Sequence, residues 1–538
     1  MPAISYSMFS AGAKGYQIVR PVYWMLGLIV LFYFFNGLFY LRVQSVTFDE
    51  SSFTDYAARL LNGHPERKYP QSDNSKMPVS VLNLLPRAIE QLFHPGLKKQ
   101  DNGASDIFAG RYITLVFSLL IILLVFRWSN SLYGEKAALF SAFLMSFCPN
   151  LLANAGLVTT DCYSMLFLCL TMFFTWKFCN YPSYKNFIWL CLGIASSQLV
   201  KQSLIHLYIL VPVIFLIFYS VCRPVIRWKS AVVYFGSFLF LNWLVINLGF
   251  YFRDSHLALG QYAFVSNTFQ HVQKILPSWL PVPLPRAFVD GLDLSKYYDQ
   301  IGGGNALQSS YGKVTILGNS STGGSFWYYY IVSFLFKTPV SSLLFILSSC
   351  LLVFKNRAKT AFFKNEFFLL APVIYYGIYM SFFYKTQIGI RQFIFVYPLL
   401  YILCGSMIVW IKNRYLQYVM VAMGIFLLFS VLRFWNNYYS FTNEMISDKK
   451  MAYRYVGSSN LEFGQSQFFF NQYLKDHPEI RMAPVIPAEG VFLIRLHDYM
   501  DIWNLHQFEW IRHIPPSGVV AYNGLLITVT ASDLKSLQ

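Results

Sequence analysis

Long apolar runs separated by short polar links dominate the chain. A helix needs about 20 mostly apolar residues to cross a bilayer. We mark eleven runs of about this kind, at 22–40, 112–128, 137–153, 163–178, 187–200, 204–222, 231–252, 326–354, 367–384, 392–411 and 415–434. The run at 187–200 is the shortest and could be re-entrant. The pattern therefore predicts a polytopic α-helical membrane protein with about eleven transmembrane helices.

Lysine and arginine gather in every second short link. Cytoplasmic links of membrane proteins are enriched in these residues, and here the enriched links contain Lys14, Arg20, Arg127, Lys136, Lys177, Lys185, Arg223, Arg227, Lys229, Lys355, Arg357, Lys359, Lys364, Lys412 and Arg414. The opposite links hold little besides Lys201, Lys385 and Arg391. This alternation predicts that the N-terminus lies on the cytoplasmic side of the membrane and the C-terminus on the outer side. The first run lacks a small-residue cleavage site, so we expect it to stay as a helix.

Three sizeable polar regions then fall on the outer side, at 42–106, 253–325 and 435–538. The tail combines alternating stretches at 491–496 and 519–530 with amphipathic ones at 465–474 and 505–511. These patterns predict a small α/β domain. We therefore divide the chain into a membrane module, 1–434, which includes the outer loops and their helices, and an extracytoplasmic domain, 435–538. No internal repeat is evident, which argues against a carrier with a site between repeats.

Composition narrows the functional classes. The chain is 56% hydrophobic and 12% charged, which is too apolar for a soluble protein of 538 residues. Its net charge of +17 does not indicate nucleic-acid binding, because the positive residues lie between apolar runs. All eight cysteines lie in or beside apolar runs without CxxC spacing, and the histidines form no HExxH pair. We therefore expect neither disulfides nor a zinc site.

Two adjacent carboxylates, Asp49 and Glu50, stand just after the first apolar run. Carboxylates at a membrane edge are costly unless they have a role. They could cap a following helix, since negative charge is favourable at a helix N-terminus. We prefer a catalytic role for the pair, as a base for a substrate that leaves the bilayer.

Several cations lie near the same predicted membrane surface. Arg391 begins a predicted span, and a guanidinium can hold a phosphate with paired hydrogen bonds. Lys385, six residues earlier, and Lys76 in the first outer loop share this predicted role. Each of these cations could instead extend toward lipid headgroups or interfacial water.

Asp161 and Lys201 lie at the outer ends of the fourth and fifth predicted spans. At one depth on neighbouring helices, they would form an ion pair or line a cavity with Asp49. We expect Lys201 to help bind a phosphate and Asp161 to support the cavity. Lys337, about a third of the way into its apolar run, is either functional or extends toward the outer face.

Short motifs in order along most of the chain resemble the polyprenyl-phosphate-sugar glycosyltransferases of the GT-C superfamily. That group includes protein O-mannosyltransferases and lipid A aminoarabinose transferases, and the bacterial members are the most similar. The motifs are Phe48-Asp49-Glu50, Ser75-Lys76-Met77-Pro78, Thr160-Asp161, Lys201-Gln202, Lys337-Thr338-Pro339, Ile388-Gly389-Ile390-Arg391 and Ser459-Asn460-Leu461-Glu462-Phe463-Gly464-Gln465. Two departures concern substrate contacts. Gln392 stands where relatives often have His, and Glu462-Phe463 stands where they often have Asp-Trp.

The resemblance implies a GT-C fold and an inverting transferase. It would move one sugar from a polyprenyl-phosphate carrier, such as undecaprenyl phosphate, to an acceptor hydroxyl at the outer face. Asp49 would accept the hydroxyl proton, and Arg391 with Lys385 or Lys201 would stabilise the leaving phosphate. Gln392 and Lys337 would support the cavity. No cofactor is required, although Asp161 with Glu50 could bind a divalent cation.

The acceptor stays open between protein Ser/Thr, lipid A and an envelope glycan. The resemblance places the protein in a bacterial cytoplasmic (inner) membrane. Three other functions fit part of the pattern: a flippase for a lipid-linked sugar, a ligase for a polyprenyl-diphosphate glycan, and a membrane scaffold. A scaffold function would not explain why four charged residues are predicted at the same membrane depth, namely Asp49, Asp161, Lys201 and Arg391.

Overall fold

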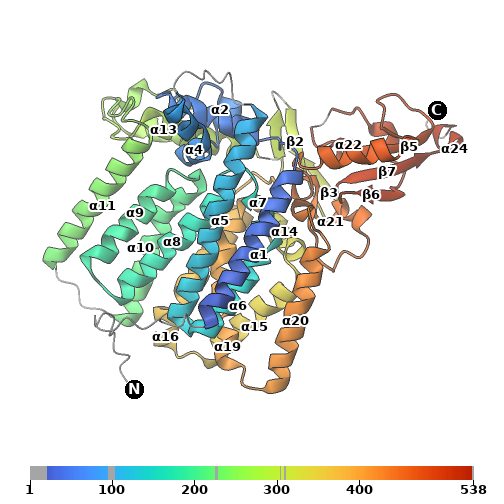
Figure 1. Ribbon diagram of the computed structural model, residues 1–538. Helices are drawn as coiled ribbons and strands as arrows, with labels where there is room; N and C mark the ends of the chain where they lie inside the picture. The colour runs from blue at the N-terminus through green and yellow to red at the C-terminus, as the bar shows by residue number, and fades with distance from the viewer. Residues whose placement is uncertain are drawn as a thin grey trace.

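A computed structural model gives the fold of the protein. It describes residues 21–94, 103–223, 228–302, 304–307, 310–503 and 505–535. Lys14, Arg20 and Arg227, which contributed to the predicted orientation, lie outside the described residues. The described residues form a helical bundle with a cap of loops and small sheets at one end (Figure 1).

The bundle is built from apolar helices because a helix satisfies its own backbone polar groups without water. Its helices are α1 (Pro21–Val43), α5 (Ala104–Tyr133), α6 (Glu135–Ser146), α7 (Pro149–Ala155), α8 (Asp161–Asn180), α9 (Tyr184–Ser197), α10 (Leu207–Cys222), α11 (Trp228–Gly249), α14 (Tyr329–Lys337), α15 (Val340–Asn356), α16 (Lys359–Lys364), α17 (Phe367–Phe382), α18 (Tyr397–Cys404), α19 (Ser406–Trp410) and α20 (Arg414–Leu432). Large apolar side chains such as Trp24, Leu216 and Phe429 are exposed on outer helices. Exposed apolar faces of this extent suit contact with lipid.

Six of the described helices are long and apolar enough to span a membrane, and the number reaches eight if each of two bent pairs is one span. The bent pairs are α6 with α7, at 61°, and α14 with α15, at 113°. The predicted count of eleven spans stays a prediction. The protein is an integral membrane protein by the number and length of these helices.

Three predicted spans are not straight helices. The runs at 137–153 and 326–354 break at Pro149 and Pro339, each of which occupies or precedes the first position of the second helix. Proline disfavours helical backbone at the residue before it, so the chain turns there. The run at 392–411 divides into the 3-10 turn Ile394–Val396 and the two short helices α18 and α19. The run at 187–200 forms the 14-residue helix α9.

The polar regions gather at one end of the bundle, while α16 and α19 lie at the other (Figure 1). The first of these regions contains α2 (Glu50–Leu61), α3 (Pro70–Asp73), the 3-10 helix η1 (Pro78–Leu84) and α4 (Leu85–Phe93). The second contains α12 (Asn267–Ile275), α13 (Arg286–Ile301) and an antiparallel sheet of β1 (Gly304–Leu307), β2 (Ser310–Ile316) and β3 (Asn319–Thr322).

The tail forms a small domain beside this cap. Its sheet has the order β4-β5-β7-β6, with β4 and β5 parallel and the other pairs antiparallel. The elements are α21 (Tyr453–Val456), α22 (Gln467–Asp476), β4 (Ile480–Met482), β5 (Gly490–Arg495), α23 (Leu496–Met500), β6 (Gly518–Val520), β7 (Gly524–Val529) and α24 (Ala531–Lys535). Strands β5 and β7 coincide with the predicted alternating stretches. The amphipathic stretch at 505–511 contains only a 3-10 turn, Glu509–Ile511.

Candidate active site

Asp49 lies in the loop between α1 and α2. Its side chain makes no capping hydrogen bond to α2, so the capping role considered for it is not observed. Instead, Asp49 Oδ2 accepts a hydrogen bond from Arg391, with an N–O distance of 2.7 Å. The Asp49 side chain remains 30% exposed, whereas that of Arg391 is 8% exposed. The carboxylate is thus both paired and open to a ligand.

Arg391 lies on the 3-10 turn η4 (Ile390–Gln392), and its position depends on Gly389. This glycine has a φ of +99°, and a Cβ there would stand 2.6 Å from the Ser459 carbonyl oxygen. The Asn460 side chain accepts the Ile390 N–H at 2.8 Å. Beyond this turn, the Arg391 guanidinium lies 4.2 Å from the centroid of the Phe463 ring. Packing and hydrogen bonds therefore aim Arg391 at Asp49.

The electrostatics of the pair keep both groups charged. Burial alone would raise the pKa of Asp49, but the charges of Arg391 and Lys76 outweigh it and hold that pKa below its usual value. Burial opposes the charge of Arg391 as well, and the Asp49 carboxylate overcomes it and raises the Arg391 pKa. Asp49 is therefore an ionised carboxylate at neutral pH.

Lys76 lies just before η1 and is the second cation near Asp49. Its side chain is buried, with Nζ 3.8 Å from the centroid of the Phe53 ring. Burial lowers the Lys76 pKa, and the charge of Asp49 partly restores it. This buried position argues against a headgroup contact and supports the predicted place in the cavity.

Asp161 begins α8 and pairs with Lys201, with an N–O distance of 2.6 Å. Lys201 Nζ also lies 3.5 Å from the backbone carbonyl oxygen of Arg391. Both side chains of the pair are at most 10% exposed. The ion pair considered from the sequence is therefore present, and it lies directly beside the Arg391 turn.

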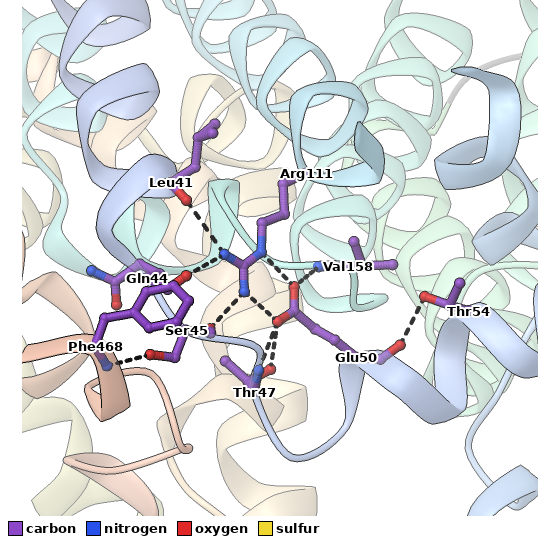
Figure 2. A network of polar contacts seen from close by, with 9 residues as sticks. All are labelled: Leu41, Gln44, Ser45, Thr47, Glu50, Thr54, Arg111, Val158 and Phe468. Atoms are coloured by element: carbon purple, nitrogen blue, oxygen red, sulfur yellow. Dashed lines mark hydrogen bonds and ion pairs between the residues drawn. The ribbon is translucent and has the colours of Figure 1, made fainter. Parts of the chain in front are cut away.

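Glu50 is neighbour to Asp49 in sequence but has a different environment. Figure 2 shows it facing Arg111 of α5 inside a closed network. Arg111 donates to both Glu50 oxygens, at 2.9 and 2.6 Å, and neither side chain is exposed. The backbone N–H groups of Thr47 and Val158 donate to Glu50 as well.

The same arginine also binds the loop that contains Asp49. Arg111 donates to the backbone carbonyls of Leu41, Gln44 and Ser45 (Figure 2). The catalytic role predicted for Glu50 is therefore corrected, since its oxygens are occupied and unexposed. Glu50 fixes the loop, and it is not a free ligand for the divalent cation considered with Asp161.

We expect Glu50→Gln to destabilise the protein more than it alters the chemistry. The amide loses charge-assisted hydrogen bonds with Arg111, which contribute about 1.5–3 kcal/mol. The measurement is the thermal unfolding midpoint in detergent, together with the pH profile of turnover by the folded fraction. A lower midpoint with an unchanged pH profile is expected. A shifted pH profile at an unchanged midpoint would show that Glu50 titrates in the reaction.

Lys337 lies at the break between α14 and α15 and is buried, which excludes its extension to the surface. Its Nζ donates to the backbone carbonyls of Tyr439 and Asn460, at 2.6 and 2.7 Å. It lines a small pocket together with Arg391 and Asn154. Lys337 thus anchors two segments of the tail against the bundle, next to the turn that positions Arg391.

Two predicted site residues make no side-chain hydrogen bond within the described residues. The Lys385 side chain is exposed, and its backbone N–H donates to Asp299 at 2.7 Å. Gln392 is half-buried. Of the lysines predicted to bind a phosphate with Arg391, Lys76 and Lys201 are therefore buried in the ionic cluster, whereas Lys385 is exposed.

The structure adds Arg111 to the predicted site residues, and it brings Phe463, noted in the sequence only as a departure from the family motif, against Arg391. A lone arginine at the outer end of an apolar helix usually has a buried partner, and that signal could have identified Arg111. No local pattern indicates that Phe463 would lie under Arg391. Within the described chain, no three His, Cys, Asp or Glu side chains are grouped so as to hold a metal ion.

Part of the chain matches a known protein family. Residues 103–250, less than a third of the chain, match the model of a family described as dolichyl-phosphate-mannose-protein mannosyltransferase. This match confirms, over those residues, the resemblance that the motifs indicated. No curated protein matches the chain.

Solved structures give partial similarity. ArnT from Cupriavidus metallidurans bound to undecaprenyl phosphate has a TM-score of 0.49 at 10% identity, covering 94% of this chain and 98% of that one. The archaeal oligosaccharyltransferase AglB from Archaeoglobus fulgidus, in complex with an inhibitory peptide and a dolichol-phosphate, has a TM-score of 0.45 at 13% identity. That alignment covers 76% of this chain and 54% of AglB.

Proposed function

We propose that the protein is an inverting glycosyltransferase that moves one sugar from a polyprenyl-phosphate carrier to an acceptor hydroxyl. The observation that carries this proposal is the pairing of Asp49 with Arg391, two residues 342 positions apart, in a partly open site. The family match over 103–250 supports the same class of reaction. We place the reaction at the outer face of a bacterial cytoplasmic membrane.

The two ion pairs differ in exposure, and this difference indicates which pair takes part in the reaction and which is structural. Glu50 and Arg111 are both unexposed and bound on every side, as expected of a structural anchor. Asp49 is 30% exposed and is held by one arginine that a ligand can take over. Only the second pair can exchange partners without leaving an uncompensated charge in the core.

The donor phosphate would bind Arg391, with Lys76 and Lys201 nearby. A guanidinium matches two phosphate oxygens, whereas a lysine supplies a compact charge. As the phosphate takes part of the Arg391 charge, the pKa of Asp49 would rise, because Arg391 is the largest cause of its lowering apart from the opposing burial. Donor binding thereby makes Asp49 a better base.

In the transfer, the acceptor oxygen forms a bond to the anomeric carbon and gives its proton to Asp49. The bond from the anomeric carbon to the phosphate oxygen breaks, and its electron pair stays on the phosphate. Polyprenyl phosphate leaves with that charge stabilised by the three cations. A single carboxylate opposite the leaving group implies one displacement and therefore inversion at the anomeric carbon.

The test uses the purified protein in nanodiscs with a panel of polyprenyl-monophosphate sugars, each with candidate acceptors. Release of polyprenyl phosphate from one donor, with an inverted product linkage, is expected. Movement of the lipid-linked sugar across the bilayer without release would identify a flippase. Release only from polyprenyl-diphosphate glycans would identify a ligase.

We expect chelation of divalent cations to leave turnover unchanged. Arg391, Lys76 and Lys201 already supply the positive charge that a metal would bring to the leaving phosphate. The measurement is polyprenyl phosphate release after dialysis against EDTA, with MgCl₂, MnCl₂ or ZnCl₂ added back. A loss above tenfold that one of these ions restores would contradict this expectation.

A further inference from the structure

A cleft of about 170 Å³ opens between the Asp49 loop and the C-terminal domain. Its walls include Val46 and Phe48 from the loop and Glu462, Gly464 and Ser466 from the tail. Pockets for drug-sized ligands measure roughly 300–1,000 Å³. This cleft is smaller and suits one ring or one short polar group.

Two segments, one from the Asp49 loop and one from the tail, form the wall between the cleft and the ionic cluster. The Ser45 N–H donates to the Gln465 carbonyl at 3.0 Å, and the Phe48 N–H donates to the Phe463 carbonyl at 3.1 Å. These two backbone hydrogen bonds hold the segments side by side.

Neighbouring residues of the wall face different sides. On the tail segment, Glu462, Gly464 and Ser466 line the cleft, whereas Phe463 lies against Arg391. On the loop segment, Phe48 lines the cleft, and Thr47 binds Glu50 (Figure 2). Asp49, which pairs with Arg391, directly follows Phe48 in the chain.

The cleft is lined by two buried polar side chains. Ser466 is 1% exposed, and its hydroxyl makes no hydrogen bond within the described residues. Glu462 is equally buried, and its Oε2 accepts the backbone N–H of His497 at 2.7 Å and lies 3.0 Å from His497 Nδ1. A buried hydroxyl without a partner, beside a carboxylate that can accept further hydrogen bonds, favours a ligand with several hydroxyl groups.

An aromatic surface faces these polar groups. Phe48 is 44% exposed although it is packed edge-on against Phe463 and His497. A Cβ on Gly464 would stand 3.1 Å from the Phe48 ring, so this glycine leaves the ring in place. Arg495, at the end of β5, completes the rim. The cleft thus offers an apolar ring face on one side and hydrogen-bonding groups on the other.

We infer that this cleft binds a saccharide unit of the acceptor, so that the acceptor is a glycan or glycolipid. This inference rests on the proposed function. A sugar ring has both an apolar face and several hydroxyls, which matches Phe48 opposite Glu462 and Ser466. An extended peptide would instead need a free strand edge, and the two segments of the wall already pair with each other.

Because the cleft and the ionic cluster lie on different faces of the wall, the donor and the acceptor would approach from different sides. The donor phosphate meets Arg391 on one face of the wall, and the acceptor enters on the other. Asp49 stands at the end of the wall, where an acceptor hydroxyl from the cleft can reach it. The wall keeps the two substrates apart everywhere except at the base.

The test is saturation-transfer NMR with the full-length protein in nanodiscs. The probes are methyl glycosides of mannose, galactose, glucose and N-acetylglucosamine, and a peptide rich in serine and threonine. Glu462→Gln and Ser466→Val are compared with the matched control Glu509→Gln, which changes an exposed acid of the same domain. Size-exclusion chromatography verifies that each variant is folded.

At least a tenfold loss of binding for one glycoside in both cleft variants, but not in Glu509→Gln, is expected. Equal glycoside binding in all variants would overturn the inference, as would a peptide signal that the two cleft substitutions abolish. The binding readout needs no turnover. If glycosides bind as expected but no lipid donor is consumed, the proposed function fails while the saccharide site stands.

Discussion

Asp49→Asn is expected to lower turnover by about 10²–10⁴-fold, the usual contribution of a general base. The amide keeps the size of the side chain and can still accept a hydrogen bond from Arg391. It cannot take the proton of the acceptor hydroxyl. Donor binding is expected to persist, since the cations that meet the phosphate are unchanged.

The measurement is release of polyprenyl phosphate from the donor that wild-type protein uses, with donor binding followed separately. Asp55→Asn is the matched control, because Asp55 is an exposed acid on α2, the helix that directly follows Asp49. The control should retain wild-type turnover. Near-normal turnover by Asp49→Asn would remove Asp49 as the base.

Arg391→Ala is expected to reduce turnover by about 10²–10³-fold, as for the loss of one group that stabilises developing negative charge. The defect should appear in use of the donor, with the KM for the acceptor nearly unchanged. Arg391→Lys should recover part of the rate, because it restores charge without the paired donors. Arg454→Ala, at an exposed arginine of α21, is the control.

The same variant has a distinct pH signature. In the wild type, Arg391 and Lys76 hold the pKa of Asp49 below its usual value, so kcat/KM should stay level into weakly acidic solution. Without Arg391, burial raises that pKa, and the base becomes protonated at higher pH. The acid limb of the profile should therefore move upward in pH. An unshifted limb, or a pure acceptor defect, would overturn the assignment of Arg391.

Local patterns in the sequence determined the membrane character of this protein and the region of its site. Runs of apolar residues are sufficient to predict spanning helices, since the bilayer thickness sets their length. Most of the predicted runs recur as helices, and β5 and β7 recur where side chains alternate. Asp49 was identified for a local reason as well, because a carboxylate at a membrane edge is costly.

The pairing of oppositely charged side chains could not be predicted from the sequence and depends on the fold. Asp49 and Glu50 are adjacent and chemically alike, yet one faces Arg391 and the other faces Arg111. Neither arginine lies within 60 residues of its carboxylate. Whether an acid is an anchor or a base depends on burial and partners, and both arise from packing between distant segments.

Packing between distant segments also explains the other differences between the predictions and the structure. Lys385 and Lys76 were indistinguishable as surface cations, but packing buried Lys76 beside Asp49 and left Lys385 exposed. Pro149 and Pro339 could have signalled the breaks, although the bend angles depend on neighbouring helices. Local sequence patterns were therefore sufficient to predict the helices, their apolar faces and the acidic site. The pairing of charges and the cleft required the fold, because they join segments that no local periodicity connects.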